Sequence, residues 1–189
     1  MPHQHFIIYK PYGYLSQFNY NLKRNKKLLG ELYDFPEGIM AIGRLDEDSE
    51  GLLLLTTDGM MSEIVRGRKV EKEYYAQVDG LITPKAAAQL ASGVVIGVKG
   101  EKYTTLPCRA QILNNPPELP ERGKKIRDER HGPTSWVSIT VTEGKFRQVR
   151  KMTSAVGFPT LRLVRVRVGN ILLGNLQPGE VRQVKEFEL

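Results

Sequence analysis

Runs of apolar residues recur along the chain, and their length and spacing predict the strands of a sheet. Residues 52–56 form the longest run, with four consecutive leucines, which is typical of a strand buried on both faces. In residues 161–168 the apolar positions change phase once, which predicts a bulge or a change in the face that is covered. Further strands are expected at residues 6–9, 38–42, 72–78, 94–98, 109–113, 136–141 and 171–173, and after the turn at 177–180.

Four segments combine helical spacing with capping residues: 28–33, 60–65, 85–91 and 146–156. Thr57 or Asp58 can cap the second of these, which ends at Gly67. Thr83 and Pro84 provide the cap and the first residue of the third. Strands and helices are interspersed without regular β-α-β alternation. We therefore predict an α+β fold with a mixed, mainly antiparallel central sheet flanked by helices and loops.

One long segment, residues 114–133, has no predicted helix or strand. It contains four prolines, and its nine charged residues are five basic and four acidic, so that their charges nearly cancel. We interpret it as a solvated loop rather than as a dedicated RNA-binding arm.

Composition indicates a globular protein, with 189 residues of which 40% are hydrophobic and 26% charged. A chain of this length can bury one good core or divide it between two lobes. The apolar runs are too short to span a bilayer, and the N-terminus lacks the long apolar segment of a signal peptide, so we expect a cytoplasmic protein. The single cysteine, Cys108, excludes an internal disulfide, and its neighbours offer no base to activate it. We interpret it as a half-buried structural thiol.

The net charge of +7, from 28 Lys and Arg against 21 Asp and Glu, favours a polyanionic partner but is weak evidence alone. Against this background, four acidic residues stand together within residues 46–50. Carboxylates near phosphate are electrostatically unfavourable. A carboxylate used for chemistry is the best explanation of such a cluster.

Two other interpretations of the acidic cluster remain open, and a third is excluded. The pattern Asp46-x-Asp48-x-Glu50-Gly51 imitates the first half of an EF-hand calcium loop, but its twelfth position is Thr57, where a bidentate Glu is required. A magnesium-dependent nuclease remains possible, because paired carboxylates can hold metal ions. A polar turn, in which Asp and Ser cap backbone groups, is the structural alternative.

The predicted helix at 146–156 separates an apolar side from a basic side. Helical spacing places Phe146 and Val149 on the first side and Arg147, Arg150 and Lys151 on the second. The basic side is either a solvated face or the source of a guanidinium that reaches the acidic loop. In the second case it would keep a carboxylate ionised.

Tyr74 and Tyr75 are adjacent in a predicted strand and must face opposite ways. Core packing is the better interpretation for one of them, and the other could be a platform on which an extruded base stacks.

Several motifs of cofactor and metal chemistry are absent from the sequence. It contains no Gly-x-Gly-x-x-Gly fingerprint, no Walker A loop and no zinc-deaminase signature. What remains is carboxylate chemistry on a nucleic acid without an obvious cofactor.

Taken in chain order, these segments resemble the RsuA-type pseudouridine synthases over nearly the whole chain. The matching segments are Lys10-Pro11-Tyr12-Gly13, Gly43-Arg44-Leu45-Asp46-x-x-Ser49-x-Gly51-Leu52, Lys72-x-Tyr74 and Glu143-Gly144-Lys145-x-Arg147-Gln148-Val149-Arg150-Lys151-Met152. Stretches 133–136 and 155–163 resemble the branch of the family that acts on 23S ribosomal RNA. The resemblance implies a single catalytic domain over residues 1–189, with two lobes around a central cleft and without the usual N-terminal S4 domain.

The resemblance also implies roles for three residues. Asp46 is the expected catalytic aspartate, acting either as a nucleophile at C1′ or as a base at C2′ of the target uridine. Arg150 is expected to pair with Asp46 and hold it ionised. Tyr74 is expected to stack on the target base and to relay a proton at C5.

Four further residues are expected to contact the RNA. Arg44 would fill the gap left by the flipped nucleotide, since residues i and i+2 of an extended loop point the same way. Val149 would pack against the base, and Lys10 and Arg147 would support RNA contact.

The function expected from the resemblance is that of a site-specific 23S rRNA pseudouridine synthase that needs neither cofactor nor metal. Its expected partner is 23S rRNA or a pre-ribosomal large-subunit particle, and it would act as a monomer and bind no membrane. Two alternatives stay open: a metal-dependent RNA nuclease, and a non-catalytic rRNA-binding assembly factor.

Overall fold

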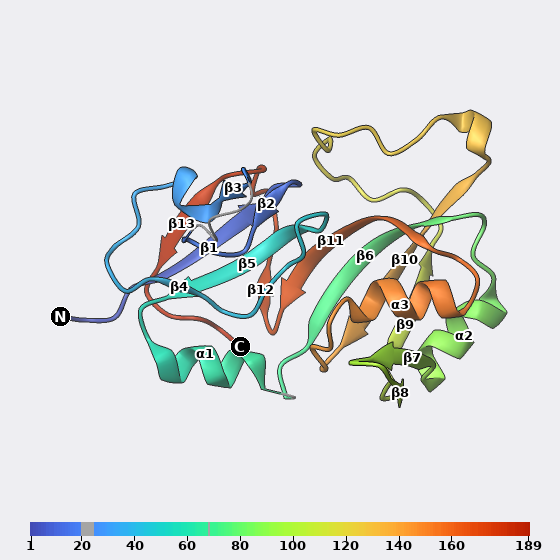
Figure 1. Ribbon diagram of the computed structural model, residues 1–189, viewed down its shortest axis with the longest axis horizontal. Helices are drawn as coiled ribbons and strands as arrows, with labels where there is room; N and C mark the ends of the chain where they lie inside the picture. The colour runs from blue at the N-terminus through green and yellow to red at the C-terminus, as the bar shows by residue number, and fades with distance from the viewer. Residues whose placement is uncertain (20–24, 68) are drawn as a thin grey trace. The chain divides into compact units, whose positions relative to one another are not determined.

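The computed structural model describes residues 1–19, 25–67 and 69–189, which form two compact units (Figure 1). The first unit combines Met1–Val70 with Val164–Leu189, and the second consists of Glu71–Leu163. Strand β11 (Thr160–Val168) begins in the second unit and ends in the first. No helix in the described part of the chain is both long and apolar enough to cross a membrane.

The first unit is built on strands in the order β13-β1-β5-β11. Strand β1 (His5–Lys10) pairs antiparallel with both β13 (Val181–Val184) and β5 (Glu50–Thr56). On its other side, β5 pairs in parallel with β11. Every residue of β1 and β5 is buried, which confirms the prediction that the leucine run forms a strand covered on both faces.

Short elements complete this unit. Strand β4 (Met40–Ala41) pairs with β5, β12 (Ile171–Leu172) pairs with β11, and β2 (Tyr14–Leu15) pairs with β3 (Lys27–Leu28). Helix α1 (Gly59–Arg66) follows the predicted cap, since the Asp58 side chain accepts a hydrogen bond from the Met60 N–H at 3.0 Å.

The helix predicted at residues 28–33 is wrong. Leu28 is extended because it belongs to β3, and only one 3₁₀ turn, η1 (Leu29–Glu31), follows it. The Glu31 carboxylate accepts a hydrogen bond from the Leu28 N–H, and Gly30 lowers helical propensity in the middle of the segment. Strand pairing at Leu28 therefore overrides the helical pattern of residues 28–33.

The second unit contains strands in the order β11-β6-β10-β9. Strand β10 (Thr134–Val141) pairs antiparallel with both β6 (Lys72–Asp79) and β9 (Arg109–Leu113). The remaining elements are α2 (Pro84–Ser92), α3 (Gln148–Ala155) and the hairpin of β7 (Val95–Val98) and β8 (Glu101–Thr104). The α+β class and the mainly antiparallel pairing agree with the prediction.

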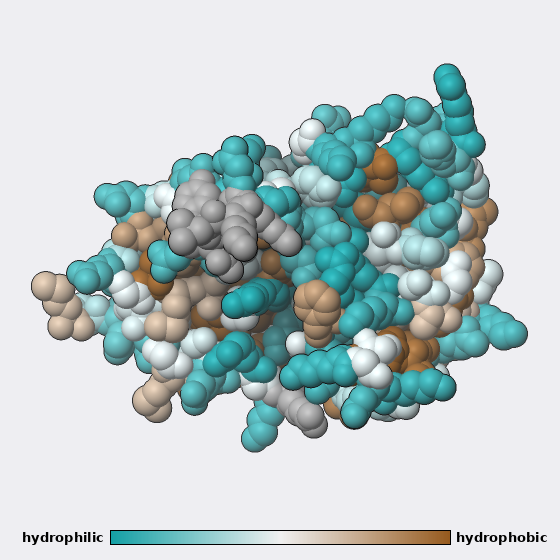
Figure 2. Space-filling model, in the orientation of Figure 1, coloured by the Kyte–Doolittle hydropathy of each residue, from teal (hydrophilic) through white to brown (hydrophobic). Residues whose placement is uncertain are grey.

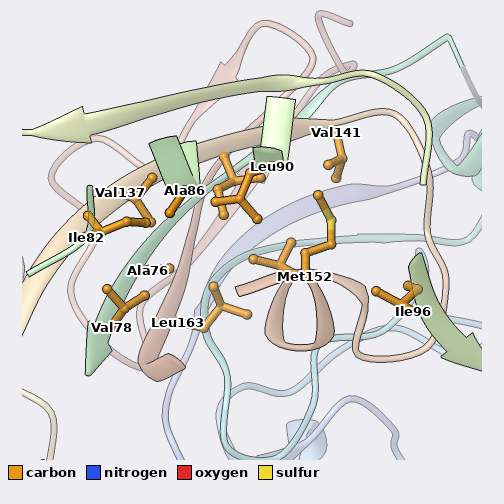
Figure 3. Close-up of a cluster of buried hydrophobic side chains, with 12 residues drawn as sticks. Ala76, Val78, Ile82, Ala86, Leu90, Ile96, Val137, Val141, Met152 and Leu163 are labelled. Atoms are coloured by element: carbon orange, nitrogen blue, oxygen red, sulfur yellow. The ribbon is translucent and has the colours of Figure 1, made fainter. Parts of the chain in front are cut away.

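Side chains from β6, β10, α2 and α3 converge on the core of the second unit (Figure 3). Leu90 of α2 and Met152 of α3 are completely buried in it. Leu163 of β11 belongs to this core, whereas Val164 is the first residue of β11 in the other unit. A change in the face that is covered therefore explains the predicted phase change in this strand.

Three details of the second unit differ from or extend the prediction. Helix α3 begins at Gln148 because Arg147 adopts a left-handed conformation with φ of +51°, so that Phe146 lies outside the helix and is 70% exposed. The predicted apolar face shared by Phe146 and Val149 is therefore wrong. Strand β8 was not predicted, because its short sequence is largely exposed and carries no periodic signal.

The long loop at 114–133 contains only one 3₁₀ turn, η2 (Glu129–His131). Three arginines attach it to the second unit. Arg122 donates to the Leu161 carbonyl at 3.3 Å, and Arg162 donates to a loop carbonyl at 2.6 Å. Arg127 forms an ion pair of 2.8 Å with Asp79. The segment is a loop, as predicted, with these anchoring contacts.

Cys108 lies immediately before β9 and is half-buried, as predicted. Its Sγ donates to the Leu90 carbonyl at 3.2 Å. Burial, aided by the negative charge of Glu143, raises the pKa of this thiol to about 11. The thiol is therefore protonated at neutral pH and serves the packing of α2 on β9.

Candidate active site

The acidic loop, residues 43–49, leads into β5 and carries Arg44 and Asp46. Leu45 lies between them and is 5% exposed, whereas Arg44 is exposed and Asp46 is half-buried. The Ser16 hydroxyl donates to the Leu45 carbonyl at 2.7 Å and accepts from the Leu45 N–H at 3.0 Å. One side chain thus holds both backbone groups of Leu45, the residue between the two candidate site residues.

A second set of contacts joins the acidic loop to the Lys10–Gly13 turn. The Gly13 N–H donates to the Glu47 carbonyl at 2.8 Å. The φ of Gly13 is +86°, a backbone conformation that favours glycine. Within the loop, the Ser49 N–H donates to the Asp46 carbonyl at 3.0 Å. The Glu47 side chain forms an ion pair of 2.6 Å with Lys26. The first two motifs of the sequence therefore fold as one structure.

Lys10 is completely buried beneath this structure. Its Nζ donates to the carbonyls of Pro11 and Tyr14 at 2.8 and 2.7 Å and to that of Glu47 at 3.4 Å. Burial lowers its pKa from 10.5 to about 8, and nearby carboxylates oppose this shift. These are Glu50, Asp48, Asp46 and Glu47. Lys10 therefore supports the acidic loop from inside, and the RNA contact expected of it stays a prediction.

Gly51 follows the acidic loop at the point where β5 pairs with β11. Its φ is +109°, and a Cβ added there would lie 2.3 Å from the backbone oxygen of Arg165. Any side chain would push β5 and β11 apart, so the close parallel pairing requires glycine at the end of the motif.

Tyr74 lies on β6 in the second unit, where it is half-buried and packs against the hydrophobic core. Tyr75, its neighbour, lies on the other face of the strand. Partial burial and the charge of Glu73 raise the pKa of Tyr75. The core thus supports Tyr74 from one side, an arrangement suited to a rigid aromatic platform.

The start of α3 is organised by two side chains that were not singled out from the sequence. The buried Glu143 accepts hydrogen bonds from the Leu106 N–H at 2.9 Å and from the Tyr103 hydroxyl. The Gln148 side chain donates to Glu143 at 3.0 Å and accepts from the Lys145 N–H at 3.2 Å. Glu143 and Gln148 stand five positions apart, on either side of the turn that precedes α3. This spacing is the signal that could have identified them.

The three predicted site residues of this segment have different environments. Arg147 is half-buried at the left-handed residue before α3, and Arg150 is half-buried one turn later. Val149 is 3% exposed and belongs to the hydrophobic core, so its role in this structure is to pack α3 against the sheet. Contact of Val149 with a base stays a prediction.

The predicted site residues thus form two groups. The first unit holds Lys10, Arg44 and Asp46 around one rigid loop, and the second holds Tyr74 on β6 with Arg147, Val149 and Arg150 at α3. The ion pair between Asp46 and Arg150 stays a prediction. Within residues 1–19, 25–67 and 69–189, no group of three or more His, Cys, Asp or Glu side chains is placed to hold a metal ion.

Comparison with known proteins connects this geometry to a family. The model of the RNA pseudouridylate synthase family matches residues 4–155. The ribosomal large subunit pseudouridine synthase E of Vibrio parahaemolyticus is 40% identical over 181 residues, which cover 95% of this chain and 73% of the relative. The enzyme of the same name from Xanthomonas campestris is 40% identical over 178 residues, 93% of this chain and 92% of the relative.

The fold is also that of a solved enzyme. The crystal structure of a pseudouridylate synthase superposes with a TM-score of 0.77 at 28% identity, covering 97% of this chain and 71% of that one. The match spans both units described above. The chain belongs to the RNA pseudouridylate synthase family, whose members are isomerases.

Proposed function

We propose that this protein isomerises one uridine of 23S ribosomal RNA to pseudouridine, with Asp46 as the catalytic carboxylate. The observation that carries the proposal is the hydrogen-bonded acidic loop, in which Ser16 holds Leu45 between Arg44 and a half-buried Asp46. Support for the substrate comes from relatives at 40% identity that are named for the ribosomal large subunit.

In this reaction the C1′–N1 bond of the uridine breaks, the uracil turns, and a C1′–C5 bond forms. C5 loses its proton and N1 gains one, so the product is an isomer and no reagent is consumed. Asp46 serves as a nucleophile at C1′ or as a base at C2′. Both roles require its ionised form.

The remaining roles divide between holding the reacting base and holding the RNA. Arg150 supplies a guanidinium to Asp46 and keeps it ionised. Tyr74 stacks on the extruded uracil, supported by the core behind it. Arg44 projects from the exposed side of the loop and takes the place of the extruded nucleotide in the RNA stack. The substrate is 23S rRNA, either free or in a pre-ribosomal particle.

The test is to incubate the protein with an unmodified 23S rRNA transcript and map pseudouridine by carbodiimide reactivity. The expected result is one modified position, full-length RNA and no loss of activity in EDTA. Shortened RNA that disappears with EDTA would instead identify a metal-dependent nuclease. Tight binding with no modification of the transcript or of pre-ribosomal particles would identify an assembly factor and contradict the proposed function.

A further inference from the structure

A hollow of about 380 Å³ opens on the surface of the second unit, between β7 and α3. Its volume falls within the range of about 300–1,000 Å³ that is usual for small-molecule sites. The strand provides an apolar wall with exposed backbone, and the helix provides a polar wall. The lining residues are Val95, Ile96, Gly97, Arg147, Arg150, Lys151, Ser154 and Ala155.

Three of the residues that line this hollow, Arg147, Arg150 and Lys151, are cationic. Arg147 directly precedes α3, and Arg150 and Lys151 lie in the first turn of this helix. Lys151 is held in place, because its Nζ donates to the Gly97 carbonyl on the opposite wall at 2.7 Å. A phosphodiester has the negative charge and the acceptor oxygens that lysine and arginine side chains bind.

An exposed aromatic ring stands beside the cations. Phe146 is 70% exposed, because the left-handed Arg147 turns it out of the helix. The Lys151 Nζ lies 5.2 Å from the centroid of this ring. Proteins that bind single-stranded nucleic acids combine these two features, namely cations that follow the backbone and an aromatic face on which a base stacks.

Hydrophobic residues at the surface are scattered (Figure 2). On the face of the molecule shown in Figure 2, hydrophobic residues form small, separate patches among hydrophilic ones. An aromatic ring that borders a cationic hollow is therefore better suited to a single base than to an extended apolar partner.

We propose that this hollow binds the single-stranded nucleotide next to the target uridine. The phosphodiester lies against Arg147 and Lys151, and the base stacks on Phe146. The assignment rests on the proposed function, because Arg150 lines the hollow and also serves the reacting uridine in that proposal. Phe146 and Lys151 add contacts outside the reacting nucleotide, so changes at these two residues alter RNA affinity.

The electrostatic half of the site is tested with Lys151→Gln, and Lys85→Gln serves as its matched control. Lys85 is exposed on α2 of the same unit and lies outside the hollow, so both variants lose one charge. Affinity for the unmodified 23S rRNA transcript is measured by filter binding over a series of salt concentrations. Lys151→Gln should lower the slope of log K against log salt by about 0.7–0.9, whereas Lys85→Gln should leave it unchanged.

The stacking half is tested with Phe146→Leu and Phe146→Trp. The leucine variant should bind the transcript about tenfold more weakly with an unchanged salt slope, and the tryptophan variant should restore affinity. Because the ring is mostly exposed, both variants should unfold at the wild-type temperature. The single-turnover rate at saturating RNA should stay within about twofold of wild type for the Lys85→Gln control.

The nucleotide site proposed in the hollow and the proposed function can each be refuted without the other. Equal affinity and salt slope for Lys151→Gln and Lys85→Gln, or wild-type affinity for Phe146→Leu, would overturn the site. A wild-type protein that forms no pseudouridine would contradict the proposed function, and the binding comparison would still decide the hollow.

Discussion

Replacing Ser16 with alanine should separate the position of the acidic loop from the stability of the fold. The hydroxyl makes two hydrogen bonds to the backbone of Leu45, at 2.7 and 3.0 Å. Each bond is worth about 0.5–1.5 kcal/mol net, and the N–H left without its partner adds a desolvation penalty. We expect the free energy of unfolding to fall by about 1–3 kcal/mol.

The effect on catalysis should be larger than this loss of stability suggests. Asp46 is the next residue after Leu45, and a shift of its carboxylate by about 1 Å is sufficient to slow a reaction about 100-fold. We therefore expect the single-turnover rate of pseudouridine formation to fall by about 10- to 100-fold. Affinity for the 23S rRNA transcript should change by less than about threefold, because Ser16 makes no RNA contact in the proposal.

Two further variants make this prediction specific. Ser16→Thr keeps the hydroxyl and should retain more activity than Ser16→Ala. Ser92→Ala removes a hydroxyl that donates to the Gln89 carbonyl at the exposed end of α2, and it should leave the rate unchanged. A wild-type rate for Ser16→Ala would refute the reasoning, because the position of the Asp46 carboxylate would then not depend on the hydrogen bonds between Ser16 and Leu45.

Three other predictions concern single positions. Gly51→Ala should destabilise the protein by about 2–5 kcal/mol in chemical denaturation, because its Cβ would collide with the Arg165 backbone at a positive φ; a loss below about 1 kcal/mol would contradict this. The pKa of Lys10 is about 8 in the fold and 10.5 as its ordinary value, so the unfolded chain binds more protons between these values. Stability should therefore rise with pH across that window by on the order of 3 kcal/mol relative to Lys10→Met, and parallel curves for the two proteins would refute the burial of this charge. Arg150→Ala should slow pseudouridine formation at least about 100-fold under single-turnover conditions, and an innocuous result would refute its proposed pairing with Asp46.

Local sequence signals predicted the elements whose determinants are themselves local. The leucine run of β5 identified a strand because burial on both faces requires apolar residues in succession. Asp58 and Thr83 identified helix starts because each caps a nearby backbone N–H. The same approach failed at Leu28, where pairing with β2 prevailed, and at Phe146, where the left-handed Arg147 makes the helix begin only at Gln148.

The candidate site shows a similar division. The motif around Asp46 was recognisable because its residues are contiguous in the chain. The hydrogen bonds between Ser16 and Leu45 were not recognisable, because they connect residues 29 positions apart and depend on the turn after Lys10. The burial of Lys10 was not predicted either, because a lysine in a motif gives no sign that its ammonium group donates to the carbonyls of a nearby turn. Long-range backbone contacts of this kind require the structure.

The central claim is tested most directly by restoring the protein to cells that lack it. Pseudouridine in 23S rRNA is mapped after complementation with wild type, Asp46→Asn or Asp48→Asn, the last being a matched change in the same loop. We predict that one modified uridine disappears without the protein and returns with wild type and Asp48→Asn but not with Asp46→Asn. Return of that modification with Asp46→Asn would contradict the account.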